Sequence, residues 1–322
     1  MGNHYSHSEE GRSLIELNSG LQLHIVADAG ALGEGLGWPW DLPFIWAGLL
    51  RPEEFSAVIT ETMTLDPWEG NFRPWAPWRV LRPIFTRADW WRPWSYFTEY
   101  PDWVNAFGLT NSGLESWIGR IYPRLSHLSY PVIPSVHLDS EAEACRAARR
   151  LNCLTLKAVH LDVSYPNVSA KSWQETVGIC STAAERSRHP LIIKLGYDPD
   201  GDYIRIAEAV DGLEMVQALQ AINTVPHGIV FPNRTSPLRR LGGGGVSGPS
   251  IRLYTDEAIS SLKKAGVKTP LLASGGLYGI RDLSALMRSG ADAFALGTLF
   301  FYPWRPNRLV RDWSIPIPPG PA

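Results

Sequence analysis

The chain has 322 residues and a formal net charge of −2, from 30 Lys and Arg against 32 Asp and Glu. This near-balance gives no electrostatic reason to expect nucleic acid or an anionic membrane as a partner, and no apolar run reaches membrane-spanning length. The hydrophobic fraction of 44% is ample for a large core. A polar amino-terminal sequence argues against a secretory signal, and three cysteines without metal-ligand spacing favour a reduced, cytoplasmic protein.

The first part of the chain predicts a tail, a hairpin and one strand. Residues 1–12 are expected to be a loose tail. Residues 14–26 alternate in hydrophobicity around Asn18-Ser19-Gly20, which is typical of a hairpin and would cap the floor of a barrel. Residues 27–37 are rich in glycine and open the first strand-end loop, and residues 57–65 predict a strand that carries Glu61.

A segment rich in tryptophan and proline follows, from residue 66 to 103. Proline at this density rules out a regular helix or a central strand. Arginine beside tryptophan suggests an excursion that packs on itself through cation–π contacts. Two interpretations stay open: a structural flap held by its own aromatic residues, and a lid that stacks on a flat substrate and excludes water.

Strand and helix patterns then alternate to the end of the chain, with polar residues clustered just after the strands. This alternation predicts a single (β/α)8 TIM barrel over residues 1–322, with the Trp- and Pro-rich flap as an insertion and residues 303–322 as a surface tail. The predicted strands are 132–136, 158–163, 191–195, 218–222, 271–273 and 293–296, and the predicted helices are 114–125, 140–151, 172–186, 203–209, 255–265 and 280–287.

The last two strands each end in glycine. Ser274-Gly275-Gly276 follows one strand and Gly297-Thr298 the next, after the earlier loop Gly244–Pro249. Because parallel strands place their carboxyl ends on one face, these loops are expected to meet, and glycine lets backbone N–H groups approach an anion. One such turn is also explained by tight strand-to-helix packing, but the succession favours a phosphate site.

Polar side chains at the predicted strand ends are candidates for the chemistry. Lys194 lies in an apolar strand, where its charge is costly without a negative partner. Amides offer both donor and acceptor to a planar ligand, although each Asn alone is also an ordinary turn residue. The scattered histidines have no metal-ligand spacing, so we assign no metal. The candidates are Glu61, Asn105, Asp162, Tyr165, Asn167, Lys194, Asn223 and Thr224.

In their order and spacing, these motifs resemble the dihydroorotate dehydrogenase family from about residue 21 to 298. The matching pieces are Ile59-Thr60 with Thr62, Leu65-Asp66-Pro67, Glu69-Gly70-Asn71, Asn105–Gly113, Ser164 with Pro166-Asn167, Ile193-Lys194-Leu195, Ile222-Asn223-Thr224, Gly244–Pro249, Ser274-Gly275-Gly276 and Gly297-Thr298. The resemblance implies an FMN enzyme on an eight-stranded barrel. It also implies a homodimer and a small-molecule substrate.

The resemblance assigns roles residue by residue. Gly248, Gly275, Gly276, Gly297 and Thr298 would hold the FMN phosphate. Lys194 would lie near the flavin ring, where a cation stabilises the negative charge of the reduced form. Ala29 and Gly30 would line the first strand end under the flavin, and Asn105, Asn167, Asn223 and Thr224 would line the substrate pocket.

The substrate half departs from the family pattern. Glu61 stands where the family has Lys, Asp162 where it has Asn, and Tyr165 where it has a Cys or Ser base. Orotate is an anion, so this reversal of charge predicts a neutral or cationic substrate. Glu61 would alternatively be protonated by burial, or paired with Lys194 or a flap arginine.

A phenol suits a proton donor at neutral pH, so Tyr165, Asp162 and Glu61 are the expected catalytic residues. We expect an FMN-dependent oxidoreductase acting on a C–C or C=C bond next to a carbonyl, by ene-reduction or desaturation, in specialised metabolism. Tyr165 as mere pocket wall is the competing interpretation. Two other functions stay open: a genuine dihydroorotate dehydrogenase of pyrimidine biosynthesis, and a redox-inactive flavin- or ligand-binding relative.

Overall fold

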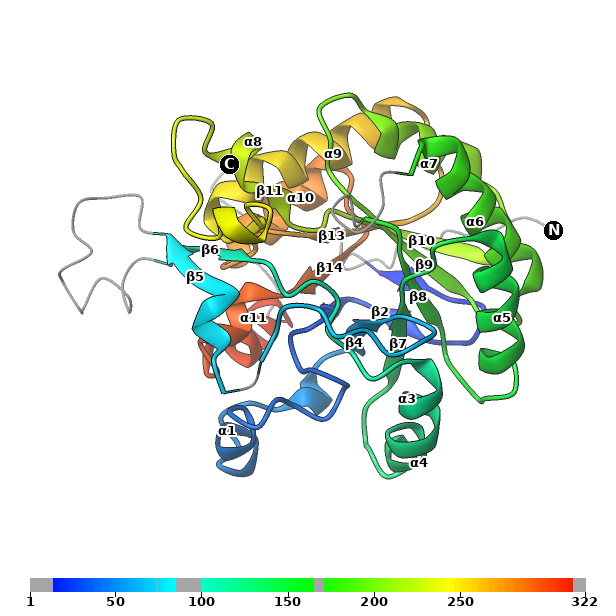
Figure 1. The fold of residues 1–322 in the computed structure, drawn as a ribbon, viewed down its shortest axis with the longest axis horizontal. Coiled ribbons are helices and arrows are strands. Elements are labelled where there is room, and N and C mark those ends of the chain that lie inside the picture. Colours follow the sequence, from blue (N-terminus) through cyan, green and yellow to red (C-terminus); the bar gives the residue numbers. More distant parts are fainter. Residues whose placement is uncertain (1–13, 74, 85–99, 165–170, 315–322) are drawn as a thin grey trace, which may run out of the picture.

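Eight parallel strands close into a barrel in the computed structural model, which describes residues 14–73, 75–84, 100–164 and 171–314 (Figure 1). Each strand pairs with the next along the chain, and the last pairs with the first. The predicted (β/α)8 barrel is therefore confirmed. The barrel strands are β3 (Ile25–Ala27), β4 (Val58–Met63), β7 (Val132–Val136), β8 (Val159–Asp162), β9 (Leu191–Leu195), β10 (Val216–Ala221), β13 (Leu271–Ser274) and β14 (Ala293–Leu296).

Helices surround the barrel as an outer layer (Figure 1). They are α1 (Leu42–Trp46), α3 (Leu114–Arg120), α4 (Tyr122–Leu125), α5 (Glu141–Leu151), α6 (Trp173–Arg186), α7 (Asp202–Val210), α8 (His227–Val230), α9 (Arg252–Lys264), α10 (Ile280–Ser289) and α11 (Arg305–Ser314). Short 3-10 turns lie at η1 (Pro52–Glu54), η2 (Pro77–Arg79), η3 (Arg239–Leu241), η4 (Pro249–Ile251) and η5 (Thr298–Phe301). Among the helices so described, none is long and apolar enough to cross a bilayer.

Local sequence accounts for where several helices begin and end. The Ser140 side chain accepts a hydrogen bond from the Glu143 N–H at the start of α5. Ser172 and Glu175 form a reciprocal capping box at α6, which satisfies two otherwise unpaired N–H groups. The single helix expected over residues 114–125 is instead two helices, because Pro123 begins a new turn.

The core has two layers. Apolar side chains inside the barrel, such as Ile59, Ile133, Ile192 and Leu272, form one buried cluster. The opposite faces of the same strands pack against the helices in a larger cluster. Because these strands are buried on both faces, their sequences are continuous apolar runs without alternating polar residues.

The predicted amino-terminal hairpin is present and closes the barrel floor. Strands β1 (Ile15–Glu16) and β2 (Gln22–Leu23) pair antiparallel, and their apolar side chains join the cluster inside the barrel. Strand β3 starts only two residues after β2, so the first barrel strand lies at the end of the segment that we expected to be hairpin.

The Trp- and Pro-rich segment builds part of a separate antiparallel sheet. Strand β5 (Leu81–Ile84) pairs with β6 (Asp102–Asn105), β6 pairs with β12 (Gly245–Ser247), and β12 pairs with β11 (Val225–Pro226). Pro83 lies in the edge strand, where a missing N–H costs no ladder bond. Residues 85–99 of the predicted flap lie outside the described part of the chain.

Three tryptophans in the described part of this segment are largely exposed. Trp68, Trp75 and Trp78 are 50%, 73% and 57% exposed. The arginine close to them in sequence, Arg73, pairs with Glu69. At the other end of the chain, the expected surface tail contains the helix α11, whose Trp313 packs edge-on against Phe294.

The outer layer of the core should dominate stability. Phe294 is fully buried in β14, so Phe294→Ala is expected to lower the free energy of unfolding by about 3–5 kcal/mol through lost burial and a residual cavity. Leu253→Ala, at a side chain that is 76% exposed, should change it by less than about 0.5 kcal/mol. Urea titration followed by circular dichroism measures both, and equal losses would contradict the assigned core.

Candidate active site

The carboxyl ends of the barrel strands bring most of the predicted site residues to one face. This placement follows from the parallel arrangement, because every strand points the same way. The residues at this mouth are Ala29 and Gly30 after β3, Asp162 at the end of β8, Lys194 in β9, Asn223 and Thr224 after β10, Gly275 and Gly276 after β13, and Gly297 and Thr298 after β14.

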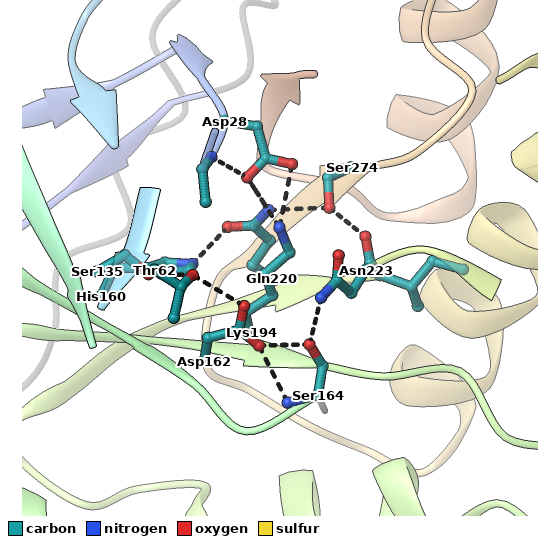
Figure 2. A network of polar contacts seen from close by, with 12 residues as sticks. Asp28, Thr62, Ser135, His160, Asp162, Ser164, Lys194, Gln220, Asn223 and Ser274 are labelled. Atoms are coloured by element: carbon teal, nitrogen blue, oxygen red, sulfur yellow. Dashed lines mark hydrogen bonds and ion pairs between the residues drawn. The ribbon is translucent and has the colours of Figure 1, made fainter. Parts of the chain in front are cut away.

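A buried ion pair lies at the centre of the mouth (Figure 2). The Lys194 ammonium donates to both carboxylate oxygens of Asp28, at 3.1 and 3.3 Å. Their side chains are only 4% and 12% exposed. The Gln220 amide nitrogen and the Ala29 N–H each donate to Asp28 Oδ1 at 2.7 Å. Lys194 therefore has the negative partner that its burial requires, and that partner is Asp28 rather than Glu61.

The charge state of Asp28 follows from these contacts. Burial by itself would raise the pKa of this carboxyl group. The ammonium of Lys194 and the hydrogen bond from Gln220 outweigh burial, so the pKa of Asp28 lies below its usual value. Asp28 is thus a carboxylate at neutral pH.

Gln220 connects this pair to a chain of hydroxyl and imidazole groups inside the barrel (Figure 2). Its amide nitrogen also donates to Ser274 Oγ at 3.0 Å, so its carbonyl oxygen faces His160 Nε2 at 2.9 Å and accepts from it. His160 Nδ1 must then accept from Ser135 Oγ, which is 2.7 Å away. Ser135 Oγ lies 2.9 Å from Thr62 Oγ1, which in turn donates to Asp162 Oδ2 at 3.2 Å.

His160 is held neutral in this chain. Burial lowers the pKa of its imidazole from 6.5 to about 4, and Lys194 acts in the same direction against the carboxylates of Asp162 and Asp28. A neutral ring can accept at one nitrogen and donate at the other, which is what Ser135 and Gln220 require.

Asp162 and Asn223 meet through Ser164. The Ser164 N–H donates to Asp162 Oδ1 at 3.1 Å, and its hydroxyl makes a second, shorter hydrogen bond to the same oxygen. Asn223 Nδ2 donates to Ser164 Oγ at 2.6 Å. Two predicted substrate-side residues, from the ends of β8 and β10 on either side of β9, are thus joined in one fixed arrangement at the mouth.

Asn105 and Thr224 approach the mouth from its rim. Asn105 lies in β6, in the antiparallel sheet, and its Nδ2 lies 3.5 Å from the Gly245 carbonyl oxygen. A Cβ at Gly245 would lie 2.2 Å from Thr224 Oγ1, so these three residues are immediate neighbours. Tyr165 and Asn167, the other predicted pocket residues, lie outside the described residues.

The glycine loops meet in a cradle that only glycine fits. A Cβ at Gly275 would lie 2.8 Å from Thr255 Oγ1, and one at Gly276 would lie 2.7 Å from the Arg252 nitrogen. At Gly248 it would lie 2.6 Å from an oxygen of the buried Asp102. All three glycines have positive φ. Gly297 differs: the atom nearest to its added Cβ is Asp28 Oδ2, 3.8 Å away, so it faces the mouth.

Sequence reasoning missed Asp28, Gln220, His160 and Ser274 as members of the polar network. A signal was present, because Gln220 and His160 interrupt apolar strand sequences, as Lys194 does. A buried polar residue in a barrel strand needs a partner on a facing strand. His160 was considered only as a metal ligand, and no group of three metal-binding side chains occurs among residues that the structure describes.

Glu61 does not join this network. The pairing of β4 with β7 shifts between Ile59 and Thr62, so Thr62 rather than Glu61 contributes the inward polar group. Glu61 lines a neighbouring cavity together with Glu34, and no hydrogen bond or ion pair in the described part of the chain joins it to Asp162 or Lys194. Burial, and then the charge of Glu34, raises the pKa of Glu61 to about 8.

The neutral His160 predicts a specific loss of stability in acid. Because its pKa is lowered from 6.5 to about 4, the unfolded chain binds the proton first, and stability falls as pH drops through that window. Between pH 7 and pH 5, the free energy of unfolding should fall by about 2 kcal/mol more in the natural protein than in His160→Gln. Urea titrations at both pH values measure this fall, and His127→Gln, at an exposed histidine, is the control. An identical fall in the free energy of unfolding in all three proteins would contradict the prediction.

Comparison with known proteins places this architecture in a family. The family model described as dihydroorotate dehydrogenase matches residues 92–309. The catalytic subunit of dihydroorotate dehydrogenase B (NAD(+)) from Desulforudis audaxviator is 32% identical over 252 residues, covering 76% of this chain and 74% of that protein. The corresponding subunit from Citrifermentans bemidjiense is 29% identical over 278 residues, covering 83% of each.

Structure comparison agrees at the level of the fold. A crystal structure of DHODH in complex with ferulenol from Eimeria tenella superposes with a TM-score of 0.68 at 16% identity, covering 93% of this chain and 82% of that one. Together with the sequence matches, the closed barrel and the ordered strand-end motifs show that this chain belongs to the dihydroorotate dehydrogenase family of oxidoreductases.

Proposed function

We propose that the protein is an FMN-dependent oxidoreductase that acts on a C–C or C=C bond next to a carbonyl group of a neutral or cationic small molecule. The observation that carries this proposal is the coexistence, at one barrel mouth, of the glycine cradle and the buried Lys194–Asp28 pair. The cradle fits a phosphate, and the ammonium fits the electron-rich end of a flavin ring.

The residues present fit FMN. Gly248, Gly275 and Gly276 leave no room for a side chain, and Gly297 opens toward the mouth. With Thr298 they would hold the phosphate, while Ala29, Gly30 and Lys194 would lie along the ring. When bound, FMN supplies the hydride acceptor or donor. The protein supplies orientation, a fixed positive charge and protons.

The charges at the mouth support a change of substrate. Two buried carboxyl groups lie close to one ammonium, Asp28 as the ion-pair partner of Lys194 and Asp162 at the cross-strand position next to it, and His160 is neutral. A further anion placed here would meet a surplus of negative charge in a site largely shielded from water, which costs binding energy. A neutral or cationic substrate avoids that cost, whereas orotate does not.

We assign proton transfer to Tyr165, and Asp162, three residues earlier in the sequence, as the acidic group near it in the chain. Asn105, Asn167, Asn223 and Thr224 would orient the substrate through amide and hydroxyl groups. In the ene-reduction direction, one carbon of the C=C bond receives hydride and the phenol gives its proton to the other carbon of that bond. In the desaturation direction the phenolate takes that proton back.

A second candidate is a genuine dihydroorotate dehydrogenase, which the names of the relatives favour. Those names also suggest a further subunit and NAD(+) as electron acceptor. A third candidate is a flavin- or ligand-binding relative without redox activity.

For the leading function, we propose that the protein is a cytoplasmic homodimer that acts in specialised metabolism.

Flavin content and reduction separate the three candidates. The purified protein should be yellow and should release FMN on denaturation. Under anaerobic conditions its absorbance should bleach with NADH or NADPH and not with dihydroorotate. Bleaching by dihydroorotate would favour the second candidate, and a yellow protein that no donor reduces would favour the third. Folded, colourless protein that takes up no added FMN would contradict the proposed function.

Tyr165 provides the test of proton transfer. Tyr165→Phe should lower turnover by about a hundredfold, the usual scale for loss of a general acid, while FMN affinity stays unchanged. Stopped-flow measurement should place the loss in the oxidation of the reduced flavin by substrate rather than in its reduction by NADH or NADPH. Unchanged turnover would mean that Tyr165 only lines the pocket and transfers no proton.

A further inference from the structure

A cavity of about 450 Å³ lies beside the barrel mouth, on the outer side of β4. This volume is within the range of small-molecule sites. None of its lining residues belongs to the Lys194 network. Its walls are the loop after β3, strand β4, the loop before α3, and α3 with the start of α4. The lining residues are Gly33, Glu34, Leu36, Gly37, Trp38, Pro39, Leu42, Glu61, Met63, Phe72, Thr110, Asn111, Ser112, Gly113, Trp117, Ile121 and Arg124.

Three aromatic residues, Trp38, Phe72 and Trp117, form part of the wall. Trp38 and Phe72 meet edge to face, with ring centroids 5.7 Å apart. Trp38 is anchored through its indole N–H, which donates to the Gly30 carbonyl at 2.8 Å. Trp117 is buried at the inner end. Such rings offer negative faces to a cation and apolar surface to an organic group.

Most neutral polar groups of the wall are already occupied. Thr110 Oγ1 accepts from the Phe72 N–H at 3.0 Å and lies 3.1 Å from the Phe107 carbonyl. The Asn111 amide donates to Thr64 and to Leu109, and its oxygen accepts from the Gly113 N–H. These contacts shape the wall, whereas the buried indole N–H of Trp117 has no hydrogen-bond partner among the described residues.

The two carboxyl groups of the wall are not occupied in this way. Within the described ranges, no hydrogen bond or ion pair reaches the side chain of Glu34 or of Glu61. The Glu61 N–H donates to the Gly33 carbonyl at 2.7 Å, which fixes the Glu34 loop against β4. The one cation in the wall, Arg124, is exposed, so water screens its charge. Two acidic groups thus share a partly aromatic cavity, and no cation among the described residues pairs with either of them.

We propose that this cavity binds a small organic ammonium ion with an apolar or aromatic body. The ammonium group lies between Glu34 and Glu61, and the body packs on Trp38 and Phe72. The raised pKa of Glu61 fits this role, because a bound cation compensates its charge and favours its ionised form. This binding needs no flavin, so it stands or fails separately from the proposed function.

Calorimetry with three molecules of the same shape tests the proposal on the full chain as purified. The probes are 2-phenylethylamine, neutral 2-phenylethanol and anionic phenylacetate. At pH 8 the amine should bind at least tenfold more tightly than the alcohol, and phenylacetate should not bind. From pH 8 to pH 6 amine affinity should fall, because Glu61, which lines the cavity together with Glu34 and Arg124, takes up a proton.

Two variants locate the binding. Glu61→Gln should weaken amine binding at least tenfold and abolish its pH dependence, while binding of the alcohol stays unchanged. Glu34→Gln, at an exposed side chain, should weaken it severalfold without risk to folding. Glu16→Gln, on the β1–β2 hairpin at the barrel floor, should bind as the natural protein does. Equal binding of amine and alcohol, tighter binding of phenylacetate, or full amine affinity in both cavity variants would overturn the proposal.

Discussion

An ammonium group buried inside a barrel must be compensated, and the Lys194–Asp28 pair is the interaction on which the mouth depends. Asp28 is fixed in turn by Gln220 and by the Ala29 N–H. Gln220 fixes the tautomer of His160, and a chain of hydroxyl groups continues to Asp162. Removing any one member leaves a buried polar group unpaired, so the site is rigid because its electrostatics must balance.

This balance of charges at the mouth distinguishes the protein from the family pattern, although the barrel architecture is shared. The glycine loops follow from backbone geometry, since the positive φ and close contacts at Gly275 and Gly276 admit no side chain. The substrate side depends instead on charge, which single residues reverse. One frame can therefore retain its cofactor position while its choice of substrate changes.

Acidic groups are divided between two places. At the mouth, Asp28 pairs with Lys194 and Asp162 lies at the cross-strand position next to Lys194, whereas Glu34 and Glu61 share the adjacent cavity with aromatic rings. The shift in strand pairing between Ile59 and Thr62 produces this division, because it turns Thr62 inward and leaves Glu61 on the cavity side. A difference of one residue in register thus assigns a charge to one site or the other.

The sequence by itself determined the barrel, the order of its strands, the glycine loops and the family, because apolar runs and glycine positions reflect local geometry that neighbouring residues specify. It also showed that Lys194 needs a partner. Only the tertiary structure identified Asp28 as that partner, 166 residues away in the chain. It alone placed Glu61 outside the network and divided the helix at residues 114–125. Pairing across a closed barrel depends on strand register and on the direction of each side chain, and these are fixed only when all eight strands have come together.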